Sequence, residues 1–437
     1  MKRTSLYALA AAGLLAGGLT ATSANAADLG GNCCADLEER IAELEATTAR
    51  KGNRKVSLTI SGWVAEQVVF WDDGVERNAY VTGIGATLSS HFKLTGQATI
   101  APGWTAGYVM HVETTTADPF FVNQNADDAN PLGSVSLLQS YWFVNSERLG
   151  KLSVGQLSHA SDNTAILVDG SGSLVPANWL IIEGTSFLTR SNGVLTGFAW
   201  GDVHHCGHTT AGIAADCNGL PLNSVRYDTP TFSGFSASAT WGEDDFWDVA
   251  ARYSGEHAGI KLAIAAAYSH QADEGVFAQR TIGIGVLQRD SDYFQIGAFM
   301  MHVDTGLFFY GAYGHENNNN TTINTSLGLL EQGDTDHYYL KAGLRRKLSP
   351  LGHTVFYGEY GNYDDMLSPA LLAANAATFS AGSEARIWGL GVVQEVDAAA
   401  MSLWLTYRNS DAEFTIDGAK TDLDDFHVIK AGALINF

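Results

Sequence analysis

The sequence predicts an all-β protein: a transmembrane antiparallel β-barrel of about 16–18 strands, preceded by a short periplasmic helix. Three observations lead to this prediction. Apolar and polar side chains alternate over segments of roughly ten residues, and short turns and long links separate these segments alternately. The chain also ends in an alternating segment whose last residue is the aromatic Phe437. A β-sandwich shares the alternation, but the turn pattern and the ending favour the membrane barrel.

The composition restricts the classes of protein to which the chain can belong. It has 437 residues, enough for two or three soluble domains or for one large barrel. Its formal net charge is −22, with 25 Lys and Arg residues against 47 Asp and Glu residues. Nucleic-acid phosphates require cationic partners, so no nucleic-acid partner is expected. Only 8 residues are Pro, which argues against a disordered low-complexity chain.

Residues 1–26 have the pattern of a secretory signal peptide. Lys2 and Arg3 form a basic start, Leu6–Leu19 is apolar, and Ala24–Ala26 has the small-x-small pattern of a cleavage site. The apolar part is shorter than the ~20 residues that a membrane-spanning helix needs. We therefore expect the chain to be exported and this segment to be removed.

Residues 27–55 are predicted to hold a helix and a basic linker. Asp36 can cap a helix over Asp36–Thr48, and Glu39 three residues later completes a capping box. A heptad seam is formed by Leu37, Ile41 and Leu44. The seam is too short to be stable alone. Two interpretations stay open: a small periplasmic coiled coil that joins subunits, or a solvated helix without a partner.

Residues 56–437 are predicted to form the barrel. One face of the first segment carries Val56, Leu58, Ile60, Val64, Val68 and Phe70. The other face carries Ser57, Thr59, Ser61, Ala65 and Gln67. A period of two places these sets on opposite faces of a sheet, and later segments repeat the scheme. Aromatic residues near segment ends, such as Trp71 and Trp142, are typical of the girdles at membrane interfaces.

The turn pattern predicts the strand count. Short turns are expected at Ala101–Gly103, Ser146–Gly150, Ser191–Gly193, Pro230–Gly234, Gly255–Gly259, Asp304–Gly306, Ser349–Gly352 and Val396–Ala399. Long links are expected at Thr114–Ser134, Gly201–Asn223, Glu316–Thr335, Asn362–Ser383 and Asn409–Asp425. About eight hairpins with a first and a last strand make about 18 strands, or about 16 if the weakest turn, at Ser191, is dropped. A barrel of this size keeps a water-filled lumen.

Basic residues of the predicted strands fall on the polar face. Arg or Lys on the lipid side would cost ~2–4 kcal/mol at the bilayer midplane, so we expect these side chains in the lumen. They are Lys151, Arg226, Arg252, Lys261, Lys341, Arg345, Lys347, Arg408 and Lys430. The lumen is therefore predicted to carry a basic wall.

Two cysteines, Cys206 and Cys217, lie in one long link. An exported chain meets an oxidising environment, so we expect a disulfide within this loop. His204 and two further histidines nearby are alternative metal ligands, but their spacing matches no zinc pattern. No metal ion or cofactor is predicted.

Several stretches of the chain carry a family resemblance. They are Cys33–Arg40, Lys51–Leu58, Phe70–Gly74, Trp241–Asp248, Leu344–Leu348 and the ending at Phe437. Together they resemble alphaproteobacterial outer-membrane porins, over most of the chain after the signal peptide. The resemblance implies a homotrimer in the bacterial outer membrane, with barrels of about 16 strands. It also implies water-filled channels for passive diffusion of ions and small hydrophilic solutes.

The same resemblance implies that the third external loop, about residues 157–178, folds into the lumen. The acids Asp162, Asp169 and Glu183 then face the basic wall. The wall residues predicted at this constriction are Arg226, Arg252, Lys261, Arg345 and Arg408. Opposed charges produce a transverse field that disfavours apolar solutes, while loop and wall set the size cutoff. The alternative is that the acids belong to a solvated loop.

Other functions compete with this interpretation. Acidic stretches such as Asp72–Asp73 and Asp422–Asp425 suit divalent cations that bridge to lipopolysaccharide, and solvated loops explain them equally well. A substrate-specific uptake channel is the main alternative, and an adhesin with a plugged lumen is another. A hydrolase that uses His159, Ser161 and Asn163 is less favoured, because a catalytic triad usually draws on distant parts of a chain. No enzyme activity is predicted.

Overall fold

The computed structural model describes residues 55–437, except for 86, 116, 128–133, 179–184, 205–218, 244, 275–287, 319–321, 326–327, 332, 368–380 and 417. Several predictions lie outside the described residues. They concern the signal peptide 1–26, the helix Asp36–Thr48, the acid Glu183 and the disulfide between Cys206 and Cys217. These stay predictions.

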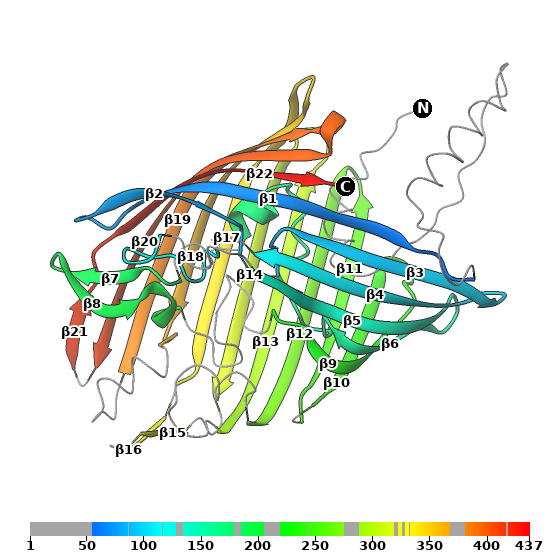
Figure 1. The fold of residues 1–437 in the computed structure, drawn as a ribbon, viewed down its shortest axis with the longest axis horizontal. Coiled ribbons are helices and arrows are strands. Elements are labelled where there is room, and N and C mark those ends of the chain that lie inside the picture. Colours follow the sequence, from blue (N-terminus) through cyan, green and yellow to red (C-terminus); the bar gives the residue numbers. More distant parts are fainter. Residues whose placement is uncertain are drawn as a thin grey trace.

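Sixteen strands form a closed antiparallel barrel in the described part of the chain (Figure 1). They are β1 (Thr59–Asp72), β3 (His91–Ala101), β4 (Trp104–Thr115), β5 (Ser134–Ser146), β6 (Gly150–Leu157), β9 (Leu222–Asp228), β10 (Phe235–Gly242), β11 (Trp247–His257), β12 (Ile260–Glu274), β13 (Gln288–His302), β14 (Leu307–Asn318), β17 (Thr335–Ser349), β18 (Gly352–Asp364), β19 (Ala381–Val396), β20 (Met401–Ile416) and β22 (Phe426–Asn436). β1 pairs with β3 on one side and with β22 on the other. The ring therefore closes without a free edge.

Two further strands explain the uncertainty in the predicted strand count. The sheet as described has eighteen strands, because β2 (Arg77–Thr82) and β21 (Ala419–Asp422) add to it. β2 pairs with the second half of β1, and β21 pairs with the last residues of β20. Both lie in connections between barrel strands, so eighteen less two leaves the sixteen of the ring. The lower end of the predicted range is confirmed.

Seven of the predicted short turns join neighbouring barrel strands. The prediction that Ser191–Gly193 does so is wrong. This turn joins β7 (Leu188–Ser191) to β8 (Val194–Ala199), which pair with each other in a separate sheet. The local pattern of a hairpin is the same in both situations, so only the pairing partners distinguish them.

The remaining described elements are short and lie in the connections. A second hairpin consists of β15 (Thr322–Thr325) and β16 (Gly328–Glu331). Helical turns are α3 (Leu174–Asn178), η1 (Trp200–Asp202) and η2 (Asp397–Ala399). Within the described ranges, no helix is both long and apolar enough to cross a membrane.

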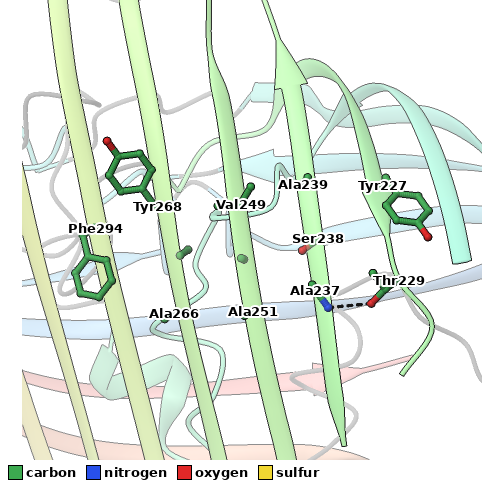
Figure 2. A pocket seen from close by; sticks show the side chains of 12 residues that line it. Tyr227, Thr229, Ala237, Ser238, Ala239, Val249, Ala251, Ala266, Tyr268 and Phe294 are labelled. Carbon is green, nitrogen blue, oxygen red and sulfur yellow. Dashed lines mark hydrogen bonds between the residues drawn. The ribbon is translucent and has the colours of Figure 1, made fainter. Parts of the chain in front are cut away.

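The outer face of the barrel wall is apolar. A hollow of about 480 Å³ lies in this face over β9–β13. Figure 2 shows Tyr227, Tyr268 and Phe294 around the hollow, with small side chains such as Ala239 and Ala251 between them. The small side chains leave space that the neighbouring rings do not fill. An apolar lining is expected for a surface that faces lipid.

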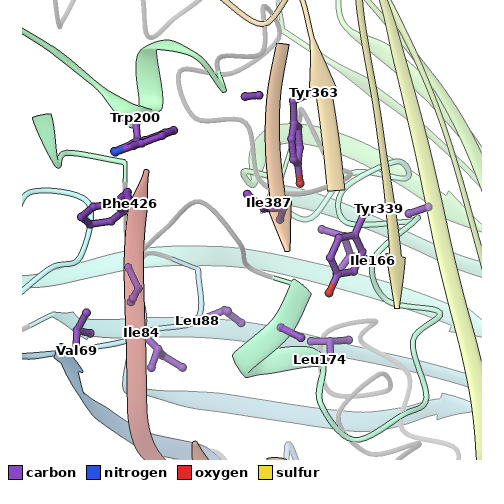
Figure 3. Close-up of a cluster of buried hydrophobic side chains, with 14 of the residues drawn as sticks. Val69, Ile84, Leu88, Ile166, Leu174, Trp200, Tyr339, Tyr363, Ile387 and Phe426 are labelled. Carbon is purple, nitrogen blue, oxygen red and sulfur yellow. The ribbon is translucent and has the colours of Figure 1, made fainter. Parts of the chain in front are cut away.

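The segment Ser158–Asn178, here called the inner loop, follows β6 and lies inside the barrel. Figure 3 shows its residues Ile166 and Leu174 together with Tyr339 of β17, and all three belong to one buried apolar cluster. The inner loop therefore packs on the wall with its apolar side chains.

Gly297 on β13 allows a close approach between the wall and the inner loop. A Cβ atom at this position would lie 2.0 Å from the carbonyl oxygen of Ala165 and 2.8 Å from its Cα. Side chains do not tolerate such distances to backbone atoms, so a larger residue would push the wall and the loop apart.

We expect Gly297→Ala to destabilise the folded barrel by about 1–3 kcal/mol, because the added methyl group overpacks the contact with Ala165. The measurement is the temperature at which the detergent-solubilised protein loses its compact band on a gel. Gly358→Ala on β18 is the matched control, since a Cβ there first meets the Leu390 side chain, at 3.4 Å. Equal unfolding temperatures for the two variants would contradict the prediction.

Candidate pore constriction

The inner loop begins at a carboxylate of the wall. Asp248 on β11 accepts hydrogen bonds from His159 Nδ1 at 2.6 Å, from the Ser161 backbone N–H at 2.7 Å and from the Ser161 hydroxyl at 2.7 Å. It also accepts one from the Ala160 backbone N–H at 3.2 Å. All four residues are buried. Asp248 therefore fixes the first turn of the inner loop to the wall.

Two arginines of the wall donate to carbonyl oxygens of the same turn. Arg226 on β9 donates to Ser158 O at 2.8 Å and to His159 O at 3.1 Å. Arg252 on β11 donates to Ala160 O and to the Thr164 hydroxyl. A chain segment inside a barrel has no sheet partner for its carbonyl groups, and unpaired buried carbonyls are costly. The guanidinium groups supply these partners.

A buried ion pair holds the middle of the inner loop. Lys341 Nζ on β17 lies 2.5 Å from Asp169 Oδ2, and both side chains are 0% exposed. The same ammonium group donates to Asn178 Oδ1 at 2.7 Å. One wall cation thus links two points of the loop that are nine positions apart in sequence.

The end of the inner loop, at α3, rests on two more cations. Arg408 on β20 donates to Ala177 O at 2.9 Å and to Glu359 Oε1 at 2.9 Å. Lys430 on β22 donates to Pro176 O at 2.9 Å. The last carbonyl groups of a helix have no partner within the helix, and cations are favourable there. The wall therefore caps α3.

Most of the predicted constriction residues that the structure describes lie at or near the inner loop. Asp162 lies in the first turn of the loop, where Ser158 and Asn163 donate to it and Arg226 is a neighbouring charge. Asp169 and Arg408 take part in the contacts just described. Arg345 is paired with Glu395, with two N–O distances of 2.8 Å.

Lys261 lies elsewhere. It is the second residue of β12, opposite Glu256 in the ladder, and no ion pair joins it to the inner loop among the described residues. The alternation of the sequence shows which face of the sheet a residue takes but not how far along the strand it lies, and this position explains why Lys261 lies away from the loop.

Three acids were not predicted as site residues: Asp248, which binds the loop, Glu359, which pairs with Arg408, and Glu395, which pairs with Arg345. Asp248, Glu359 and Glu395 lie on the wall, and the ladders place the first two on the same face as the wall cations. The available signal was their position on the polar face of their strands.

Burial raises the pKa of the loop acid Asp162 above its ordinary value, although His159 and Arg226 act in the opposite direction.

The proposed hydrolase residues do not have the geometry of a catalytic triad. Ser161 Oγ lies 3.2 Å from His159 Nδ1, and that same nitrogen is bonded to Asp248. A triad needs serine and carboxylate on different ring nitrogens. His159 and Ser161 are also 1% and 0% exposed, so a substrate could not reach them.

A second set of contacts joins the connections at the loop end of the barrel. Asp73, predicted as a surface acid, is 3% exposed and accepts from Arg190 of β7 at 2.8 Å. Burial alone would raise the pKa of Asp73, but hydrogen bonds from Gln124, backbone amides and Arg190 outweigh it and lower this pKa. A carboxyl group whose pKa is lowered in the folded state stabilises the fold at pH values above its ordinary pKa. This stabilisation is lost as the pH falls through the lowered pKa.

A closed sixteen-strand barrel with a loop fixed along its inner wall is the architecture of an outer-membrane channel. The family model of Gram-negative porins matches residues 8–415, and the chain belongs to this family. It is a porin of the bacterial outer membrane that forms water-filled channels for passive diffusion. No curated protein sequence matches the chain.

Solved structures show the same fold at low sequence identity. An anion-selective porin from Comamonas acidovorans is 16% identical, with a TM-score of 0.54, over 87% of this chain and 100% of that one. OmpF of Salmonella typhi, in a complex with daunomycin, is 13% identical, with a TM-score of 0.51, over 89% of this chain and 99% of that one. OmpT of Vibrio cholerae is 13% identical, with a TM-score of 0.50 and the same coverage.

We expect Lys341→Met to destabilise the protein by about 3–5 kcal/mol, because it leaves the buried Asp169 carboxylate without its cation. The double variant Lys341→Met with Asp169→Leu should recover most of this loss, since no buried charge remains. Heat-induced loss of the compact gel band measures both. Lys347→Met is the control, because Lys347 is 55% exposed and its contact with Asp397 spans 3.6 Å. A double variant no more stable than Lys341→Met would contradict the prediction.

Proposed function

We propose that the chain forms a homotrimeric general porin like those of alphaproteobacteria. In this proposal, ions and small hydrophilic solutes pass between the inner loop and the wall of β4, β5 and β6. One observation supports this path: the cations and acids that bind the inner loop lie on β9, β11, β17, β20 and β22, whereas the lumen-facing side chains of β5 from Gln139 to Asn145, and Lys151 on β6, are half-exposed.

The charges along this path carry the proposed selectivity. Arg226 and Asp228 form an ion pair at 2.7 Å in which the side chains are 14% and 27% exposed. Lys151 lies opposite Asp228 in the ladder and over the Phe143 ring, 5.0 Å from its centroid. Two cations against one carboxylate favour anions at this point, while the acidic loops attract cations to the channel entrance.

We further propose that Asp162, Asp169, Arg226, Arg252, Arg345 and Arg408 set the size cutoff through the position of the inner loop. The contacts of Asp162, Asp169, Arg226, Arg252 and Arg408 within the loop or between the loop and the wall support this proposal. In it, the loop is held close to one side of the wall and the passage lies on the other side. Lipopolysaccharide, bridged by divalent cations at acidic loops, is the proposed outer partner.

We expect Lys151→Glu to shift the reversal potential toward cation selectivity, because it changes the charge of the passage by two units beside Asp228. The measurement is the zero-current potential of the purified protein in a planar bilayer across a KCl gradient. Lys420→Glu is the matched control, since Lys420 lies in β21, in the connection between β20 and β22. The path along β6 would be contradicted if the reversal potential shifts equally in both variants, or in neither.

The same recordings test the general channel itself. Stepwise conductance increments in groups of three are expected for a trimer, with currents that simple salts and small sugars share without saturation. Currents blocked by one solute class would favour a substrate-specific channel. Silent membranes from a folded, heat-modifiable protein would contradict channel formation and favour an adhesin.

A further inference from the structure

Two histidines and a glutamate meet on the lumen face of β3 and β4. His91 pairs directly with Glu113 in the ladder, and His111 lies two residues before Glu113 on the same face. One candidate ligand atom from each side chain lies within 4.8 Å of the others. The three residues are 4%, 1% and 3% exposed, so they form a cluster that is closed to bulk water.

The hydrogen bonds of the cluster leave ligand atoms without partners. His91 Nδ1 lies 2.9 Å from Ser89 O, so this nitrogen carries the proton and Nε2 keeps its lone pair. Glu113 Oε2 accepts from the Thr87 backbone N–H at 3.1 Å. Glu113 Oε1 and both ring nitrogens of His111 have no hydrogen-bond partner among the described residues. Unsatisfied buried polar atoms cost ~1–3 kcal/mol each and are rare in folded proteins.

We propose that His91, His111 and Glu113 bind one divalent transition-metal ion of the zinc class. Imidazole nitrogens with one carboxylate are a typical ligand set for zinc and its neighbours, whereas calcium and magnesium prefer oxygen ligands alone. Metal–ligand bonds of about 2.0–2.2 Å would draw the three side chains slightly closer together. The ion would give a partner to Glu113 Oε1 and to one of the two His111 ring nitrogens.

Lys93 is a neighbour whose positive charge opposes the ion. It pairs with His111 in the ladder, is 8% exposed, and brings a positive charge to the same face of β3. The negative charge of Glu113 compensates only part of the positive charge that the metal ion and Lys93 bring to the cluster. Removal of the Lys93 charge should therefore strengthen metal binding, which separates this proposal from a purely structural histidine cluster.

The position of the site indicates what the ion would do. The Trp63 indole of β1 packs on the His91 ring, with 4.0 Å between centroids, and donates to Leu88 O at 2.9 Å. β1 pairs with β3 only over Thr59–Trp63, so the wall is held by few ladder bonds here. The ion would join His91 of β3 to His111 and Glu113 of β4, beside the short pairing of β1 with β3. This inference does not depend on the proposed solute path.

The test uses the full chain, purified in detergent and stripped with EDTA. Zinc binding is measured by equilibrium dialysis with elemental analysis, and Co²⁺ serves as a spectroscopic probe. We expect one ion per chain, and visible Co²⁺ bands that differ from those of the hydrated ion. His111→Gln and Glu113→Gln should weaken binding about tenfold or more, while Lys93→Met should tighten it. His270→Gln is the matched control, because His270 is also a strand histidine beside a carboxylate, 2.8 Å from Asp292.

Heat-modifiable migration on a gel checks that each variant is folded. If His111→Gln or Glu113→Gln does not fold, the Co²⁺ spectrum of the unmodified chain and the affinity of Lys93→Met decide. The proposal is overturned if the unmodified chain binds less than one ion at micromolar metal, or if its Co²⁺ spectrum is that of the hydrated ion. It is also overturned if folded His111→Gln binds zinc as tightly as the unmodified chain does.

Discussion

The requirement that every backbone polar group find a partner inside the protein governs this structure. Lipid offers no hydrogen bonds, so a sheet that crosses a bilayer has to close on itself. The pairing of β1 with β22 meets this condition, and it is the contact that joins the two ends of the barrel. Once the ring is closed, period-two alternation assigns one face of every strand to lipid and the other to the lumen.

The same requirement returns inside the lumen, where the inner loop has no sheet partner. Its carbonyl groups are bonded by wall cations at both ends, by Arg226 and Arg252 near its start and by Arg408 and Lys430 near α3. Most of these cations were predicted from the sequence as residues of the constriction, and in the structure they also donate hydrogen bonds to the inner loop. In the solute path that we propose, the passage lies on the side of the lumen where such contacts are not made.

Local pattern accounts for what the sequence could predict. Alternation and turn residues act over a few neighbours, so strand faces and seven of the hairpins follow from them. Contacts across the lumen do not: His159 and Asp248 are 89 residues apart, and Asp169 and Lys341 are 172 apart. The depth of a side chain along its strand is also invisible, which is why Lys261 and Arg408 looked alike. His111 and Glu113 share a face by alternation, but their meeting with His91 depends on the register of β3 and β4.

The choice of ion pairs over apolar contacts for the inner loop has a physical reason. Well-packed apolar residues would stabilise the loop as well as a buried pair such as Lys341 and Asp169, because desolvation offsets most of the attraction. An apolar cluster, however, tolerates a loop that slides by one residue, and the loop already has such a cluster around Ile166 and Leu174. A carboxylate that slides away from its buried cation leaves both charges unpaired, which costs several kcal/mol. The charged contacts therefore select one position of the loop, and the size cutoff that we propose for the loop depends on a single position more than on additional stability.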